Sequence, residues 1–290
     1  MKRRKGSLKR TAMLLADTQR IYMDNEMSVY AGYTTLYILM AMVPLLTLLI
    51  GVVNLLPDMS LQHFESAVQE LLPNIPELRN MLHSIITNVN RKAGTLAISV
   101  SLIASLWSAS NGVSAIQLAL RKISGRGGSF FRRRAAALLY TLIFIALIPA
   151  LFIFRVLRGS IEQLIVFINH ALNIPDIASR LVDFIEYSGV VTAFVMAVVI
   201  LLAYSYLPGD HRKPRTQLPG TLFATVLWLA FSAVFEIFIE RFWQASALYG
   251  PLASVFLAAM WLKTIMMILF YGAALNEAIH RSKGRTEEQQ

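Results

Sequence analysis

The sequence predicts an all-α integral membrane protein with six transmembrane helices and further amphipathic helices on the outer side. Two observations favour this class. Of the 290 residues, 56% are hydrophobic and only 15% are charged, against about 25% charged residues in ordinary soluble domains. Several apolar runs also reach about 20 residues, the length that crosses a hydrocarbon core of about 30 Å. Each run is expected to be a helix, because the bilayer core offers backbone groups no other partner.

The six predicted spans follow one another along the chain. They cover residues 31–56, 96–120, 135–154, 189–207, 221–239 and 251–275. Pro44 and Pro149 fall inside the first and third spans, where interior prolines commonly mark bends. The predicted organisation is therefore a cytoplasmic N-terminal segment at 1–30, a transmembrane domain at 31–279 and a cytoplasmic tail at 280–290.

The positive charges predict the orientation. Segments 1–30, 121–134, 208–218 and 276–290 together hold 19 of the 27 Lys and Arg, whereas segments 57–95, 155–188 and 240–250 hold seven. Positively charged loops stay on the cytoplasmic side, so both termini are expected there. The densest cluster, "RKISGRGGSFFRRR", forms a predicted basic rim of Arg121, Lys122, Arg126, Arg132, Arg133 and Arg134. No nucleic-acid recognition motif accompanies it, so the expected partners of the rim are membrane lipids and not nucleic acid.

Four outer segments show apolar residues at helical spacing, which predicts amphipathic helices. Two precede the second span, "LQHFESAVQELL" around Phe64 and "ELRNMLHSIITNV" around Leu82. Two more, "SIEQLIVFINHAL" and "IASRLVDFIEYSG", follow the third span. They are expected to pack against the span ends or to lie on the membrane surface. A fifth amphipathic stretch, residues 8–22, precedes the first span on the cytoplasmic side.

Lys263 is the thirteenth of the 25 residues in the sixth predicted span. A charge at that depth costs about 2.5–3.5 kcal/mol on insertion scales. We therefore expect Lys263 to face the protein interior, with Glu236 of the neighbouring fifth span as its nearest acid. A second possibility is that Lys263 faces a water-filled cavity. A structural ion pair and a functional site explain the two charges equally well at this stage.

Two other spans carry polar groups. The second span aligns Ser101, Ser108 and Asn111 on one small, polar face, which is typical either of close helix packing or of a hydrophilic path. Tyr37 lies one or two turns inside the first span and needs an internal partner for its hydroxyl. The candidate intramembrane polar site therefore comprises Lys263, Glu236, Asn111, Ser108 and Tyr37.

The residues give no sign of an enzyme. The chain has no cysteine, and its five histidines form none of the patterns that bind catalytic metals. A nucleophile elbow and a glycine-rich phosphate loop are also absent from the sequence. No catalytic residue, metal or cofactor is therefore expected.

The order of three motifs resembles the YihY/BrkB family of bacterial inner-membrane proteins. These motifs are "DNEMSVYAGYTTLYILMAMVPLL", "LWSASNGVSAIQLALRKI" and "YGPLASVFLAAMWLKTIMMILFYGAALNEAI". The resemblance covers about residues 24–279. It depends most on Ala31, Pro44, Trp107, Ser108, Ser110, Tyr249, Gly250, Trp261, Gly272, Ala273 and Asn276. It implies a six-span protein of the bacterial inner membrane, in a family that has carried the labels ribonuclease BN, virulence factor and transporter.

The chain departs from the family pattern at two positions. Where the family tends to have Gly-Ala-Glu-Leu-Asn, this chain has "GAALN", so that Ala274 replaces the acid. Glu277 follows three residues later on a similar helix face. Lys263 stands where an aromatic or apolar residue is more usual. A role in moving ions or protons that depended on the missing acid would not transfer to this chain.

The function expected from these observations is a transporter or permease for an unknown small solute or lipid. The topology, the small polar second span and the intramembrane charges favour it. The alternative is a non-transporting scaffold or a protein that handles lipids or the envelope, which would use the outer helices and the basic rim. Intrinsic ribonuclease activity is not expected. The sequence leaves the substrate, the coupling ion and the oligomeric state open.

Overall fold

The structure is a computed structural model, and it describes residues 2–53, 65, 69, 76–91, 97–125, 131, 134–143, 188–209, 212–242 and 251–287. All regular structure in these residues is helical, which confirms the predicted all-α class for this part of the chain. The helices are α1 (Lys2–Asp24), α2 (Met27–Val53), α4 (Pro76–Arg91), α5 (Ala97–Ile123), α8 (Ser188–Tyr206), α9 (Pro214–Phe242) and α10 (Pro251–Glu287). A shorter apolar helix covers Arg134–Ile143.

Five of these helices coincide with predicted spans. Helices α2, α5, α8, α9 and α10 contain most or all of the first, second, fourth, fifth and sixth spans. Of the third span, only residues 135–143, and not Pro149, fall within the described residues. In the described part, Pro214–Ile239 and Val255–Lys283 are long and apolar enough to cross a membrane. The count of six spans therefore stays a prediction.

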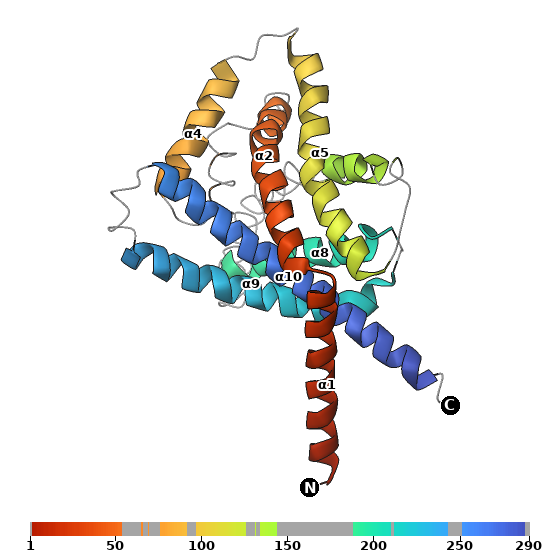
Figure 1. Ribbon diagram of the computed structural model, residues 1–290. Helices are drawn as coiled ribbons and strands as arrows, with labels where there is room; N and C mark the ends of the chain where they lie inside the picture. The colour runs from red at the N-terminus through yellow and green to blue at the C-terminus, as the bar shows by residue number, and fades with distance from the viewer. Residues whose placement is uncertain are drawn as a thin grey trace, which may run out of the picture.

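Helix α10 forms the centre of the described structure. It packs along α9 and also contacts α1, α2, α4 and α5, while α2 packs along α5 and α8 packs against α9. Figure 1 shows the pair α9 and α10 crossing α2 at a large angle. The largest buried cluster draws on α1, α2, α5, α8, α9 and α10 and includes the fully buried Met27, Ile265 and Phe270. The core therefore lies where these helices cross.

The cytoplasmic amphipathic stretch predicted at residues 8–22 lies within α1. Its last turn is anchored to α10. The rings of Tyr22 and Tyr271 are 5.1 Å apart, and the Tyr271 hydroxyl donates a hydrogen bond to Gln19 Oε1 at 2.6 Å. The N-terminal part of α1 extends away from the other helices (Figure 1). The junction with α2 is tight, because Glu26 takes a positive φ of 57° there.

Helix α4 confirms the helix predicted around Leu82, whereas its location on the outer side stays a prediction. Leu82 and Ile86 are buried, whereas His83 and Ser84 between them are exposed, so the helix is amphipathic as expected. For the segment around Phe64, the described residues are Glu65 and Gln69, both helical. Glu65 Oε1 lies 3.0 Å from His83 Nδ1 of α4. The two outer segments predicted after the third span lie outside the described residues, apart from the start of α8.

Candidate functional site

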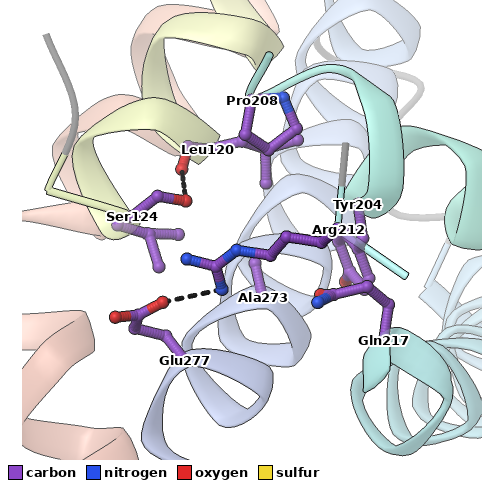
Figure 2. Close-up of a pocket in the computed structure, with 9 residues that line it drawn as sticks. Leu120, Ser124, Tyr204, Pro208, Arg212, Gln217, Ala273 and Glu277 are labelled. Atoms are coloured by element: carbon purple, nitrogen blue, oxygen red, sulfur yellow. Dashed lines mark hydrogen bonds and ion pairs between the residues drawn. The ribbon is translucent and has the colours of Figure 1, made fainter. Parts of the chain in front are cut away.

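A polar cluster lies where the end of α5, the turn between α8 and α9, and α10 meet (Figure 2). It surrounds a cavity of about 10 Å³, which is room for about one water molecule. Apolar and polar side chains share the lining, which consists of Leu120, Ile123, Ser124, Tyr204, Pro208, Arg212, Gln217, Ala273 and Glu277. The three elements are distant in sequence, so the cluster exists only in the folded chain.

Glu277 provides the negative charge of this cluster. Its Oε2 accepts a hydrogen bond from Arg212 Nη1 at 2.8 Å, and its Oε1 accepts one from Arg281 Nε at 2.9 Å. The side chains of Glu277 and Arg212 are only 8% and 14% exposed, whereas that of Arg281 is 48% exposed. A buried charge is costly unless it is paired and hydrogen-bonded, and here both conditions are met. The Arg212 contact joins the α8–α9 turn to α10 (Figure 2).

Asn276 joins α10 to the first turns of α9. Its Oδ1 accepts a hydrogen bond from the Gly220 N–H at 2.7 Å, and its Nδ2 donates one to the Gln217 carbonyl at 3.0 Å. Pro219 lies inside α9 at this point, and a proline removes one hydrogen bond from a helix. The side chain of Asn276 therefore supplies backbone partners beside an interruption in the helix ladder.

Two glycines bring α9 and α10 into backbone contact. A Cβ placed on Gly220 would overlap the carbonyl oxygen of Gly272, and a Cβ on Gly272 would lie 2.7 Å from the Gly220 carbonyl oxygen. Tyr204 of α8 completes the junction, because its hydroxyl donates a hydrogen bond to the Leu269 carbonyl at 2.5 Å. Small residues at such crossings let membrane helices approach closely. We name this junction of Tyr204, Gln217, Gly220, Gly272 and Asn276 the polar seam.

The described residues of the predicted basic rim lie in different environments. Arg121 is buried, and its Nε donates a hydrogen bond to the Pro208 carbonyl at 3.0 Å. Lys122 lies 3.5 Å from Glu26 Oε2 and 4.7 Å from the centre of the Tyr30 ring. Arg126, Arg132 and Arg133 lie outside the described residues. Arg121 is therefore covered by the α8–α9 turn, and the contact of the rim with lipids stays a prediction.

Arg134 of the rim and Asn111 of the intramembrane site contact each other directly. Arg134 Nη1 donates a hydrogen bond to Asn111 Oδ1 at 2.7 Å, and Nη2 donates one to the Trp107 carbonyl at 2.9 Å. The guanidinium also stacks on the Trp107 ring at 3.8 Å. Ser108 is half-buried beside this contact. Arg134 and Asn111 belong to separate predicted groups, because their pairing depends on how the short helix Arg134–Ile143 crosses α5.

Lys263 and Glu236 are not brought together. Both side chains are exposed, one on α10 and the other on α9. Among the described residues neither forms an ion pair or a hydrogen bond. The predicted interior position of Lys263 and its pair with Glu236 are therefore corrected, because the two residues lie on outward helix faces that hydropathy alone does not define. Tyr37 is half-buried, with its ring 4.6 Å from that of Tyr33.

Three residues of this cluster were not among the predicted site residues: Arg212, Gln217 and Tyr204. Each is polar, but each lies in a loop or near a helix end, where polar side chains are common. The available signals were indirect. Gly272 and Asn276 are four residues apart near the end of the sixth predicted span, Glu277 follows directly, and a proline precedes Gly220 just before the fifth predicted span.

The comparisons with known proteins agree with the membrane class. The family model described as virulence factor BrkB matches residues 18–290. A protein of Bacillus subtilis named ribonuclease-like protein YfkH is 26% identical over 201 residues, which are 69% of this chain and 70% of that protein. A UPF0761 membrane protein of Pseudomonas paraeruginosa is 32% identical over 83 residues, which are 29% of this chain and 20% of that one. No solved structure matches the chain.

Proposed function

The chain belongs to the BrkB family of membrane proteins, and from that premise we propose that it transports a small solute across the bacterial cytoplasmic membrane. In this proposal six spans cross the membrane and both termini are cytoplasmic. The distribution of Lys and Arg supports that orientation. The proposal concerns a permease without its own energy source, because the sequence contains no nucleotide-binding motif.

The observation that carries the proposal is the polar seam between two apolar helices. α9 and α10 contain the stretches long and apolar enough to span a membrane, yet they bury Gln217, Asn276 and Glu277 where they meet. Polar groups within membrane helices are costly and usually mark a pathway for a substrate or ion. The cavity lies at the end of the seam that this proposal places toward the cytoplasm.

In the proposed alternating-access cycle, the described conformation is the one that is closed toward the cytoplasm. The cavity has room for about one water molecule, so it is too small for a solute. The Arg212–Glu277 pair holds the α8–α9 turn against α10. In the proposed cycle this contact breaks when the cytoplasmic side opens. In the same proposal, Asn111 and Ser108 line the pathway, and Asn111 orients the guanidinium of Arg134.

The test is a flux measurement in reconstituted vesicles. Stopped-flow light scattering would follow the entry of glycerol, glycine and potassium phosphate into vesicles with and without the protein. We expect faster entry of at least one solute with the protein, and a slower rate for Glu277→Gln than for the matched control Arg281→Gln. Equal rates in empty and protein-containing vesicles, for folded protein, would overturn the proposal for these three classes of solute.

A second function is a scaffold that moves nothing across the membrane. It is favoured by the sealed character of the seam, in which the Asn276 side chain is fully buried and hydrogen-bonded to α9. A lipid-scrambling measurement separates this function from the alternative of lipid handling. Vesicles with fluorescent phosphatidylglycerol would lose half of the signal to an external quencher if lipids stay in their leaflets, and more if the protein moves them.

A ribonuclease is not the function we propose. The printed name of the Bacillus subtilis relative refers to ribonuclease, but the sequence here offers no acid–base or metal-binding constellation. We expect the purified protein to leave a labelled RNA intact. Cleavage that follows the protein through purification and is abolished by one substitution in this chain would show the opposite.

A further inference from the structure

Arg121 is a buried cation at the end of a predicted span. The residue is 9% exposed, and it lies in the last turn of α5. Its Nε donates a hydrogen bond to the Pro208 carbonyl at 3.0 Å. Arginine has five N–H donors, so the two terminal nitrogens keep four donors for other partners.

No negative group among the described residues compensates this charge. The nearest carboxylate of the cluster, Glu277, is already bonded to Arg212 and Arg281, and no ion pair of Arg121 occurs in the described part. The terminal nitrogens of Arg121 are not sealed inside the protein. The carbonyl end of α5 supplies a partial charge of only about half an elementary charge. A buried ion normally has a full counter-charge, and the described residues do not supply one here.

Gly209 shapes the place where this counter-charge would bind. Its φ is +79°, a conformation that favours glycine. A Cβ at this position would also lie 2.8 Å from Arg121 Nη2. The backbone of the α8–α9 turn therefore lies close to the guanidinium, and a side chain at position 209 would displace the Arg121 terminal nitrogen. The hydrogen bond to the Pro208 carbonyl orients Arg121, and the missing side chain of Gly209 leaves space beside Nη2.

We propose that Arg121 binds an oxyanion of the phosphate class at the turn between α8 and α9. The two terminal nitrogens of arginine match two phosphate oxygens in a bidentate contact. The phosphate belongs either to an anionic lipid headgroup or to a free or solute phosphate. The end of a span favours the headgroup, because that is the depth at which lipid phosphates lie. The site does not depend on transport, so it can exist in a transporter or in a scaffold.

The wild-type protein provides the first test. Its thermal midpoint in detergent would be measured with inorganic phosphate against chloride at equal ionic strength, and again in nanodiscs of phosphatidylglycerol against phosphatidylcholine. A rise with inorganic phosphate identifies a free phosphate as ligand. A rise with phosphatidylglycerol alone identifies the lipid headgroup. If neither raises the midpoint, the proposal is wrong.

The variant Arg121→Gln tests whether the effect belongs to this site. We expect apparent phosphate or lipid affinity to fall about 10- to 100-fold, the effect of losing a charge-assisted contact. The matched control Arg215→Gln, an exposed arginine near the start of α9, should leave the affinity unchanged. An unchanged affinity in Arg121→Gln would overturn the proposal. If that variant does not fold, Arg121→Lys replaces it, because it keeps the charge and loses the bidentate contact.

Asp210 is the competing explanation, because it follows Gly209 in the sequence and lies outside the described residues. A double-mutant cycle of Arg121→Gln and Asp210→Asn separates the two. Additive effects on the midpoint, together with a ligand response in the wild type, support the oxyanion. Non-additive effects without any ligand response assign the counter-charge to Asp210 and reject the oxyanion.

Discussion

Gly220 is the position in the polar seam where an added side-chain carbon would clash most closely. A Cβ there would overlap the Gly272 carbonyl and would lie 2.5 Å from Asn276 Nδ2. We expect Gly220→Ala to lower the free energy of unfolding by about 2 kcal/mol or more, because overpacking of a fixed backbone costs about 1–3 kcal/mol and the Asn276 hydrogen bond is lost as well. Thermal unfolding in detergent measures this change.

Gly32 of α2 is the matched control for that substitution. No atom outside its own helix lies within 4 Å of a Cβ placed there, so the methyl group meets open space. Alanine is better than glycine in a helix interior by about 1 kcal/mol. Gly32→Ala should therefore leave the midpoint unchanged or raise it. If both variants lose the same stability, the close contact at Gly220 is not the cause.

At the scale of elements, the Arg212–Glu277 pair is the contact that joins the α8–α9 turn to α10. Breaking a buried ion pair costs about 3–5 kcal/mol, although Arg281 keeps part of the compensation for Glu277. We therefore expect Arg212→Gln to cost about 2 kcal/mol or more. Arg281→Gln should cost less than about 1 kcal/mol, because its side chain is largely exposed. Chemical or thermal unfolding of both variants in one detergent makes the comparison.

A double-mutant cycle of Arg212→Gln and Glu277→Gln tests the pairing itself. The two substitutions should be non-additive, because each removes the same contact. Additive losses would mean that Arg212 and Glu277 act separately and that the α8–α9 turn is held by other groups.

Helices were predictable from the sequence, whereas the faces that they present to each other were not. Hydropathy and helical spacing depend on neighbouring residues, so they located α2, α5, α8, α9 and α10 and the amphipathic α4. The partners of a side chain depend on how each helix is rotated and crossed. For this reason the predicted pair of Lys263 and Glu236 does not form, whereas the contact of Arg134 with Asn111, which the sequence did not predict, does. The apolar pattern of a span is similar on all sides, so it carries little information on rotation.

At the scale of the whole molecule, the orientation in the membrane is open to a direct test. The chain has no cysteine, so a single introduced thiol reports its own side. We expect Gly127→Cys, in the basic segment between the second and third predicted spans, to react with a membrane-impermeant thiol reagent only from the cytoplasmic side. Reaction in intact cells from the outside would reverse the orientation of every span.

The position of the membrane along α10 decides what Lys263 does. The helix has 37 residues, or about 55 Å at 1.5 Å per residue, so it exceeds a hydrocarbon core of about 30 Å. In the apolar stretch Val255–Lys283, Lys263 lies somewhat nearer to the central residue than to the Val255 end. Trp228 of α9 packs against Trp261 of α10, with ring centres 6.5 Å apart. Val226 of α9 is therefore at about the same depth as Lys263, and it is exposed as well.

These two positions form a matched pair for the last prediction. An exposed ammonium group within the core would cost about 2.5–3.5 kcal/mol if it faced lipid, whereas an exposed valine is favourable there. We therefore expect Lys263 to contact water and Val226 to contact lipid. In the cysteine-free chain, Lys263→Cys should react with a small charged thiol reagent, and Val226→Cys should not. Equal reactivity of the two cysteines would show that no water-filled path reaches position 263.

A second variant, Lys263→Met, tests whether the charge is functional. A loss of flux without a loss of thermal stability would indicate a functional charge, because an unpaired exposed side chain contributes less than about 0.5 kcal/mol to stability.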